Sequence, residues 1–406
     1  MDIYSVGGAV RDRLLGFPVK DHDWVIVGAT PEQLLTQGFS QVGKDFPVFL
    51  HPETKEEYAL ARTERKLGKG YAGFTCYAAA DVTLEQDLLR RDLTINAMAE
   101  DADGNIYDPY NGQTDLSDKL LRHVSDAFCE DPLRILRIAR FHARYAHLGF
   151  SIADDTMVLL QSMVTTGEVE HLVSERVWQE TIRALSEKSP QIYFQTLREC
   201  GALAVIMPEF DALFGVPQPE AHHPEIDTGV HVLMALEQVC ALSDDLPPRF
   251  AILCHDFGKG KTKPEDWPRH IAHEATGLNP IKKLCQRLTV PNEYRELALI
   301  TCEYHTHIHR AVELKAKTVV KVLDATDAFR RPERFQQFLL ACEADARGRL
   351  GLELRPYPQR LFFQRALLQC QEVKAKDFIA QGLKGKEIAT AISAERVNRV
   401  AQIERQ

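Results

Sequence analysis

The hydrophobic pattern of this 406-residue chain changes near Asp131, and this change constrains the fold more than any other feature. Before it, short apolar runs such as Ile3–Val6 alternate with turns and short helical stretches. After it, apolar residues recur with the 3.6-residue period of helices, and strand patterns are sparse. The sequence therefore predicts an α+β chain, in which a small mixed α/β head precedes a long helical body.

Proline-containing breaks at 208–224 and 355–358 are the best candidates for borders within the helical part. A chain of this length accommodates about two to four domains, at roughly 100–200 residues each. We expect four regions: a head over 1–130, a helical neck and body over 131–220, a third domain over 221–350, and a helical tail over 351–406.

Composition excludes several classes of protein. Hydrophobic residues make up 45% and charged residues 26%, which is ordinary globular usage and excludes collagen-like and wholly disordered chains. The nine cysteines include no C-x-x-C pair, so neither a disulfide framework nor a zinc ribbon is indicated. No stretch reaches the roughly 18 apolar residues of a membrane span, and the first residues lack a signal-peptide pattern. We expect a cytoplasmic protein with no membrane partner.

The net charge of −9 argues at first against a nucleic-acid partner, because the chain as a whole repels polyanions. Any nucleic acid must then meet local basic patches, which supply the phosphate contacts. The sequence offers two, Arg134–Arg144 and Lys259–Lys263.

Two carboxylates, Asp21 and Asp23, stand at the start of an apolar run that is predicted as a strand over 21–27. Residues i and i+2 of a strand share a face, and two adjacent carboxylates repel unless a hard cation such as Mg²⁺ lies between them. Taken alone, the pattern is more simply explained as the solvated start of a strand. Upstream, a Gly7-Gly8 turn before a helix allows close approach to a phosphate, and Arg11 adds a cation. Together these residues suit nucleotidyl transfer.

A second group lies on the helix that begins near Asp131. Asp131, Arg134, Arg137 and Arg140 are three residues apart and share one broad face, which Arg144 extends. An aspartate accepts from an exocyclic amine and a guanidinium donates in a planar fork, so Asp131 and Arg134 can address the pairing edge of cytosine or adenine. A good match of this kind discriminates by about 1–3 kcal/mol. The alternative is that Asp131 caps the helix and the arginines form a solvated face.

A third group lies in the helical body, where His231, the pair His255-Asp256, and Asp345 follow in order. Imidazole and carboxylate ligands suit a divalent transition metal that activates a bound water. The histidine-aspartate pair is unspecific by itself, but Gly258–Lys261 follows it as a predicted flexible basic segment suited to a phosphate. Seven further histidines are candidate outer ligands, although each is more simply a surface or hydrogen-bonded residue: His222, His223, His270, His273, His305, His307 and His309.

Four motifs occur in a fixed order: Gly7–Asp12, Asp21-x-Asp23, Arg90–Ala97 and Glu130–Arg134. In this order they resemble the class II tRNA nucleotidyltransferases, the bacterial CCA-adding enzymes, over the whole chain. The order H…HD…D resembles the multifunctional form of that family. The resemblance implies a polymerase beta-like palm in the nucleotidyltransferase head, then an all-α neck, body and tail that contain an HD phosphohydrolase domain at 221–350.

The resemblance also implies roles for particular residues. Asp21 and Asp23 would be catalytic and hold Mg²⁺, with Glu57 as a weaker third acidic candidate that is equally the exposed end of an edge strand. ATP and CTP would be bound by Gly8, Arg11, Arg91, Asp131, Arg134, Arg137 and Arg140. In the HD domain, His255 and Asp256 would be catalytic. Nickel or another divalent transition metal would be held there by His231, His255, Asp256 and Asp345.

By resemblance, the protein would add and repair the 3′-terminal CCA of tRNA without a nucleic-acid template, using CTP and ATP and releasing pyrophosphate. The HD domain would hydrolyse phosphoesters as a 2′,3′-cyclic phosphodiesterase, 2′-nucleotidase and phosphatase. The alternatives are a bacterial poly(A) polymerase, an alarmone synthetase-hydrolase and a catalytically silent tRNA-binding protein. The glycine-rich loop at 66–73 is a predicted moving part. The oligomeric state, monomer or homo-oligomer, stays open.

Overall fold

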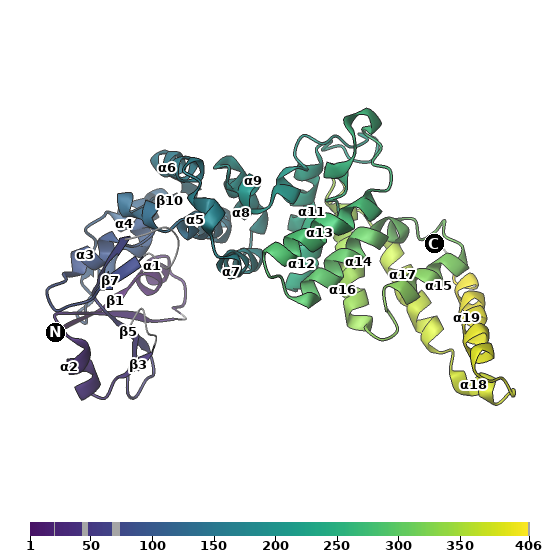
Figure 1. Ribbon diagram of the computed structural model, residues 1–406, viewed down its shortest axis with the longest axis horizontal. Helices are drawn as coiled ribbons and strands as arrows, with labels where there is room; N and C mark the ends of the chain where they lie inside the picture. The colour runs from purple at the N-terminus through teal and green to yellow at the C-terminus, as the bar shows by residue number, and fades with distance from the viewer. Residues whose placement is uncertain (20, 43–47, 67–73, 405–406) are drawn as a thin grey trace. The chain divides into compact units, whose positions relative to one another are not determined.

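The computed structural model describes residues 1–19, 21–42, 48–66 and 74–404. Its chain divides into two compact units, residues 1–206 and 207–406 (Figure 1). The finer division into four regions remains a prediction, and residues 67–73 of the predicted moving loop lie outside the described residues. Among the described helices, none is long and apolar enough to cross a membrane.

A mixed sheet forms the head of the first unit. In the described part of the chain it has seven strands in the order β3-β4-β5-β2-β1-β8-β9, and only β2 and β5 pair in parallel. Val25 and Ile26 are neighbours in β2 and bury their side chains in different apolar clusters, as alternation on a sheet requires. The strands are β1 (Asp2–Val6), β2 (Asp23–Val27), β3 (Ser40–Val42), β4 (Val48–Leu50), β5 (Glu57–Leu60), β8 (Ala99–Glu100) and β9 (Ile106–Tyr107).

The strand predicted over 21–27 begins two residues later, so that prediction is wrong at its start. β1 pairs with β2 only as far as Val6 opposite Asp23, and Gly7 then leaves the strand with φ +66°. No β1 residue remains to pair with Asp21, and the argument that Asp21 and Asp23 share a strand face fails. The register also places Asp23 opposite Glu57 of β5.

Short elements complete the head. Thr30 begins α2 with a capping box, because its side chain accepts from the Gln33 backbone N–H and the Gln33 side chain accepts from the Thr30 backbone N–H. The sequence pattern did not predict the hairpin on either side of the glycine-rich loop. These elements are α1 (Gly8–Leu14), α2 (Pro31–Thr36), α3 (Leu84–Leu89), α4 (Gly112–Asp118), the hairpin β6 (Thr63–Lys66) and β7 (Phe74–Tyr77), and the pair β10 (Leu120–Leu121) and β11 (Ser151–Ile152).

The rest of the first unit is helical, as the change of pattern near Asp131 predicts. The central helix, α5, packs against α7 and α8 and buries an apolar stripe that includes Ile135, Leu136 and Ala139. Of its arginines, Arg134, Arg137 and Arg144 are only partly buried, whereas Arg140 is buried. The helices are α5 (Leu133–Tyr145), α6 (Asp154–Thr165), α7 (Ser174–Leu185), α8 (Pro190–Glu199) and α9 (Ala202–Ile206).

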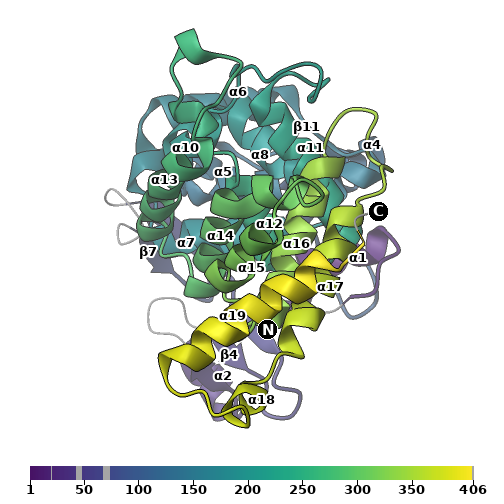
Figure 2. The same cartoon turned by 90° about the vertical axis from the view of Figure 1, so that its right-hand side faces the viewer.

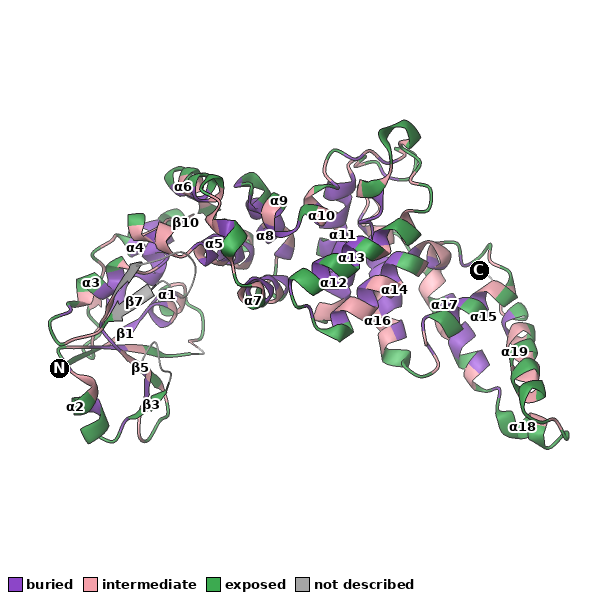
Figure 3. Ribbon diagram, in the orientation of Figure 1, coloured by how far each residue is buried: buried purple, intermediate pink, exposed green. Residues whose placement is uncertain are grey.

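The described residues of the second unit form only helices and loops. Its core lies where α12 packs against α11, α14 and α16, and the facing surfaces of these helices are buried (Figure 3). Towards the C-terminus, α19 packs beside α15 and α17 (Figures 1 and 2). The helices are α10 (Pro208–Asp211), α11 (Thr228–Leu242), α12 (Leu246–Cys254), α13 (His273–Arg287), α14 (Asn292–His309), α15 (Ala316–Ala325), α16 (Pro332–Arg347), α17 (Pro358–Gln371), α18 (Ala375–Ile379) and α19 (Lys386–Ala401).

One helix start in the second unit was predicted wrongly. The 3.6-residue periodicity of the apolar residues predicts a helix over 280–288. α13 instead begins at His273 and carries Pro280 in its interior. This difference matters, because it places His273 at the start of a helix.

Candidate functional site

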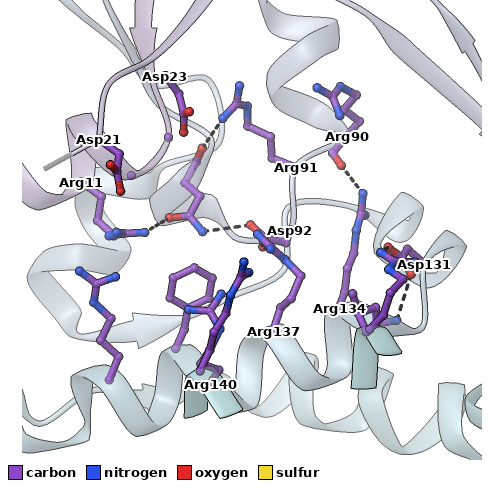
Figure 4. Close-up of a pocket in the computed structure, with 18 residues that line it drawn as sticks. Arg11, Asp21, Asp23, Arg90, Arg91, Asp92, Asp131, Arg134, Arg137 and Arg140 are labelled. Atoms are coloured by element: carbon purple, nitrogen blue, oxygen red, sulfur yellow. Dashed lines mark hydrogen bonds and ion pairs between the residues drawn. The ribbon is translucent and has the colours of Figure 1, made fainter. Parts of the chain in front are cut away.

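A cavity of about 610 Å³ lies in the first unit, between the sheet and α5 (Figure 4). Asp21 and Asp23 line its sheet side, and the arginines of α5 line the opposite side. The charged side chains among its described lining residues are nine arginines and four aspartates: Arg11, Arg90, Arg91, Arg134, Arg137, Arg140, Arg144, Arg176, Arg183, Asp21, Asp23, Asp92 and Asp131.

Asp21 and Asp23 are exposed and face the same cavity, although Asp21 is outside the strand. Among the lining residues drawn in Figure 4, no hydrogen bond or ion pair reaches either carboxylate. Two carboxylates that stay unpaired in a cavity rich in arginine fit a hard cation with oxygen ligands, such as Mg²⁺. Glu57 is exposed on the neighbouring strand.

The turn before α1 places the backbone of Gly7 and Gly8 and the guanidinium of Arg11 at the wall of the cavity. Gly7 has φ +66°, in the left-handed region that favours glycine, and a Cβ atom there would lie 2.8 Å from Nη1 of Arg91. Arg11 is buried, and its guanidinium donates to Oδ1 of Asn96 at 2.5 Å and lies 2.7 Å from Oδ1 of Asp12. It is therefore held in one orientation at the cavity wall.

Arg137, Arg140 and Arg144 of α5 are ion-paired, so the alternative of a simple solvated face is wrong for these residues. Arg137 contacts Asp92 at 2.7 Å, and Arg140 contacts the buried Glu180 at 2.7 Å. Burial by itself would raise the pKa of Asp92, but the charge of Arg137, with a hydrogen bond from Asn96 and the charge of Arg134, outweighs burial and holds that pKa far below its ordinary value. The Asp92 carboxylate is thus ionised and fixes the guanidinium that lines the cavity.

Asp131 caps α5, which confirms the capping interpretation. Its Oδ1 accepts from the Leu133 backbone N–H at 3.0 Å, and its Oδ2 accepts from Arg176 at 3.1 Å. Arg134 donates to the carbonyl oxygens of Ala127 at 2.9 Å and Arg90 at 2.5 Å. Both side chains are therefore held in place at the end of the cavity, which is compatible with a second role in binding a base.

Sequence reasoning missed several lining residues. Arg90, Asp92 and Asn96 belong to the motif Arg90–Ala97, so the signal that could have found them was present. Arg176 and Arg183 lie on α7 and reach the cavity only because α7 packs against α5. No pattern in the local sequence indicates that α7 packs against α5.

In the second unit, the structure brings together the four residues of the third group. Nε2 of His231 lies 3.0 Å from Oδ1 of Asp345, and Nε2 of His255 lies 3.2 Å from Oδ2 of Asp256 and 3.8 Å from Oδ1 of Asp345. All four side chains are buried. A buried set of two imidazoles and two carboxylates fits a divalent transition metal.

Hydrogen bonds fix which nitrogen faces this cluster. Nδ1 of His255 lies 2.7 Å from the Ile252 carbonyl, which can only accept, so Nδ1 carries the proton and Nε2 presents its lone pair. Among the described residues, Nε2 of His255 and Oδ1 of Asp256 are buried without a hydrogen-bond partner. Buried polar atoms without partners are costly, and a metal ion would satisfy both.

The segment after His255-Asp256 is not the flexible phosphate loop that was predicted. Residues Lys259–Lys261 form a short 3₁₀ helix, and Lys259 is buried. Its ammonium donates to Oδ2 of Asp256 at 2.7 Å and to Gln218 at 2.5 Å. Lys259 therefore orients Asp256 instead of contacting an external phosphate. It does not contribute to the basic patch that was predicted at Lys259–Lys263.

The additional histidines separate into two sets. His309 lies 2.6 Å from Oδ2 of Asp345, and His273 and His305 face Asp256 at 3.7 and 3.8 Å. His223 lies beside Glu225, an acidic residue near His231 that sequence reasoning missed. His222, His270, His307 and His309 belong to none of the possible ligand groups among the described residues.

Comparison with known protein families and solved structures shows the class of fold to which the chain belongs. Residues 3–122 match the family described as "Poly A polymerase head domain", and residues 149–214 match "Probable RNA and SrmB- binding site of polymerase A". The fold resembles a Thermotoga maritima CCA-adding enzyme complexed with tRNA, with TM-score 0.66, 18% identity, and coverage of 100% of this chain and 88% of that one. A Bacillus stearothermophilus CCA-adding enzyme in complex with CTP gives TM-score 0.62, 23% identity, and coverage of 98% and 89%. The fold is that of the CCA-adding nucleotidyltransferases.

Full-length relatives define the family more closely. The multifunctional CCA protein of Teredinibacter turnerae is 62% identical over 400 residues, covering 98% of this chain and 97% of its own length. The multifunctional CCA protein of Vibrio cholerae is 59% identical over 400 residues, covering 98% and 99%. The chain belongs to the family of multifunctional CCA proteins, which confirms the resemblance drawn from the motifs.

Proposed function

We propose that the first unit adds and repairs the 3′-terminal CCA of tRNA without a nucleic-acid template, using CTP and ATP and releasing pyrophosphate. The observation that carries this proposal is the pair of carboxylates, Asp21 and Asp23, which face an arginine-lined cavity of about 610 Å³ and have no ion pair with the lining residues drawn in Figure 4, in a chain of this family. A triphosphate is strongly anionic, and a surplus of fixed guanidinium groups is the complementary environment.

In this proposal the 3′-hydroxyl of tRNA attacks the α-phosphate of the nucleotide. Asp21 and Asp23 would hold Mg²⁺, which supplies charge stabilisation for the attacking and leaving oxygens when bound. Arg11 and Arg91 bind phosphate oxygens beside the Gly8 backbone. Arg137 and Arg140 approach from α5 and neutralise the charge that builds up on the leaving pyrophosphate.

Base selection is assigned to Asp131 and Arg134. Cytosine and adenine both present an amino group beside a ring-nitrogen acceptor, whereas guanine and uracil present the reverse polarity. Asp131 accepts from the amino group and Arg134 donates to the ring nitrogen. Their fixed positions support this role, because a template made of protein must not reorient with each base.

We further propose that the second unit hydrolyses phosphoesters, as a 2′,3′-cyclic phosphodiesterase, 2′-nucleotidase and phosphatase. His231, His255, Asp256 and Asp345 would hold Ni²⁺ or another divalent transition metal, which makes a bound water a nucleophile near neutral pH. The two buried atoms that lack partners, on His255 and Asp256, support this assignment.

A substitution in each unit tests both proposals. Asp23→Asn is expected to abolish incorporation of labelled CTP and ATP into tRNA that lacks its 3′ end, and to leave hydrolysis of 2′,3′-cyclic AMP intact. His255→Ala is expected to abolish hydrolysis of 2′,3′-cyclic AMP and to leave incorporation of CTP and ATP intact. Asp103→Asn, at an exposed turn of the head, is the matched control and should change neither activity. Loss of both activities in Asp23→Asn would contradict the separate assignment of the two sites.

A further inference from the structure

A separate cavity of about 550 Å³ lies in the second unit, and the proposed function does not assign it a role. Most of its described lining residues belong to the proline-containing breaks at 208–224 and 355–358, or lie near the C-terminal ends of α14 and α16. The segment after α16 is joined to the first break, because Nη1 of Arg349 donates to the His222 carbonyl oxygen at 3.4 Å. The two breaks thus line one cavity.

The charged side chains of this cavity are mostly cationic. Arg310, Arg349 and Arg355 line it, and Glu313 is the only carboxylate among its described lining residues. Glu313 contacts Arg310 at 2.9 Å, so Arg349 and Arg355 remain as a surplus of positive charge. In a chain with a net charge of −9, such a local surplus indicates an anionic ligand.

Arg349 is held in place but keeps donors for a ligand. Its side chain is 17% exposed, and Nη2 lies 3.8 Å from Oδ1 of Asp345, which is longer than an ordinary hydrogen bond. Nε of Arg349 is buried and has no hydrogen-bond partner in the described part of the chain. A guanidinium carries five N–H donors and can bind two phosphate oxygens in parallel. A buried donor without a partner is costly unless a ligand satisfies it.

Arg355 supplies the other guanidinium of the surplus. It is exposed, and the next two residues, Pro356 and Tyr357, also line the cavity. One short segment therefore offers a cation beside a proline ring and an aromatic ring. This combination suits a nucleotide, because the cation binds phosphate and an aromatic ring stacks on a base.

The cavity adjoins the buried histidine and aspartate cluster through His309. Nε2 of His309 lies 2.6 Å from Oδ2 of Asp345, and Nδ1 lies 2.8 Å from the Tyr357 hydroxyl. His309 and Tyr357 both line the cavity, so a single side chain separates a ligand there from Asp345. Cavities of about 300–1,000 Å³ accommodate small molecules, and the size of this one suits a mononucleotide.

We propose that Arg349 and Arg355, with Arg310, bind the phosphate group of a nucleotide phosphoester, and that Pro356 and Tyr357 contact its ribose and base. The ligand class is a phosphate ester at the ribose 2′ or 3′ oxygen. The buried Lys259 does not serve this phosphate, and the arginines of the cavity supply the cations in its place. This inference deepens the proposed phosphohydrolase and rests on that proposal only for the use made of the bound phosphoester.

The test measures binding to the full chain after its metals are removed by chelation, so that only protein groups hold the phosphate. Isothermal titration calorimetry with 2′-AMP gives the Kd. Arg355→Ala should raise this Kd at least about tenfold, the lower end for a hydrogen bond to a charged group. Arg349→Lys retains the charge but loses the planar fork, and it should also weaken binding. An unchanged Kd in either variant would overturn the inference.

Arg330→Ala is the matched control, because Arg330 belongs to the same unit, has a side chain that is 77% exposed and does not line the cavity. Its Kd for 2′-AMP should be unchanged. Incorporation of CTP and ATP into tRNA should be unchanged in Arg355→Ala, which assigns the lost binding to the second unit. Adenosine, which lacks the phosphate, should bind much more weakly than 2′-AMP, and equal binding would overturn the inference.

The phosphoester has two possible sources, a free mononucleotide and the 3′ end of an RNA. A short RNA that carries a 2′-phosphate at its 3′ end is therefore titrated in competition with 2′-AMP. Displacement of 2′-AMP shows that an RNA end enters the cavity, and no displacement shows that the ligand is the mononucleotide. Both results support the site and distinguish the source.

Hydrolysis of 2′,3′-cyclic AMP by the Ni²⁺-loaded chain separates this inference from the proposed function. Arg355→Ala should raise KM and leave kcat nearly unchanged, because it removes a binding contact. Arginine-dependent binding of 2′-AMP without any hydrolysis would contradict the phosphohydrolase and leave the binding site standing. Hydrolysis with the same KM in Arg355→Ala would support the phosphohydrolase and overturn this site.

Discussion

Asp92 connects the two sides of the nucleotide cavity. Its carboxylate accepts from Arg137 of α5 and, at 3.0 Å, from the Asn96 side-chain amide. Asn96 in turn accepts from Arg11 through its other side-chain atom. A single buried carboxylate thus sets the orientation of guanidinium groups from two distant parts of the sequence.

The first prediction concerns Asp92→Asn. Removing this charge leaves Arg137 without its anionic partner, and we expect a loss of about 1–3 kcal/mol of stability, the range for hydrogen bonds to charged groups. KM for CTP and ATP should rise together, because both nucleotides use the same phosphate contacts. Urea unfolding and incorporation kinetics measure the two effects, with Asp103→Asn as the control.

The effect of Asp92→Asn on stability should also depend on pH. The folded-state pKa of Asp92 is held below its ordinary value near 3.9, so its stabilising contribution is complete above that pH and is lost as pH falls towards the folded-state pKa. The stability difference between the unchanged protein and Asp92→Asn should therefore narrow below about pH 4. A difference that stays constant between neutral pH and pH 3 would exclude this electrostatic role.

A second prediction at this scale concerns Arg134. Arg134→Ala removes the donor assigned to the ring nitrogen of cytosine and adenine, and GTP and UTP incorporation should rise relative to CTP and ATP. A matched bidentate contact is worth about 1–3 kcal/mol of discrimination, which corresponds to roughly 5-fold to 150-fold. Competition between labelled nucleotides measures the ratio. Unchanged selectivity would leave Arg134 with a structural role only, through its bonds to Ala127 and Arg90.

At the residue scale, the sequence predicts features that depend on neighbouring residues and does not predict contacts between residues far apart in the chain. The carboxylates at 21 and 23 and the arginine face of α5 follow from local spacing. The partners of those arginines do not, because Asp92 and Glu180 lie 45 and 40 residues away from Arg137 and Arg140. Only the packed structure shows that the arginines are ion-paired and therefore fixed.

Elements with strong periodicity were predicted well, and elements defined by their partners were not. α5 follows from its apolar stripe, which is a property of its own sequence. The start of β2 depends on where β1 ends, and β1 ends at the backbone turn of Gly7. The prediction that Gly258–Lys261 is flexible failed for a related reason, since contacts from α13 hold that segment.

The prediction at the scale of elements is that Gly258→Ala separates α13 from the turn after Asp256. The added methyl would overlap the His273 carbonyl oxygen, and overpacking of this kind typically costs about 1–3 kcal/mol. Thermal unfolding should show the loss of stability as a lower melting temperature. Gly260→Ala is the control, because its Cβ would have 3.2 Å to the nearest atom and should have the smaller effect.

At the scale of the whole molecule, the two units use different ligand chemistry. The candidate ligands that line the cavity of the first unit, Asp21 and Asp23, are carboxylates, whereas the candidate ligands of the second unit include imidazole nitrogens. Oxygen ligands favour Mg²⁺, and imidazole favours nickel, cobalt or zinc. The net charge of −9 is compatible with an RNA partner in this arrangement, because the arginines are concentrated around one cavity.

The prediction that follows is that metal exchange separates the two activities. After chelation, Mg²⁺ alone should restore CCA addition and leave phosphoester hydrolysis absent, and Ni²⁺ should then restore hydrolysis. Both reactions are measured on one sample of protein. Full hydrolysis with Mg²⁺ as the only metal would contradict the assignment of the histidine cluster.

The central claim, that the arginine-lined cavity with Asp21 and Asp23 completes tRNA 3′ ends, has one most direct test. Purified protein is incubated with tRNA lacking its 3′ end and with all four nucleotides, and the 3′ ends of the products are sequenced. We predict that the products end in C, C and A, and that Asp23→Asn gives no added nucleotide. Long adenylate tails, or CCA addition that persists in Asp23→Asn, would contradict it.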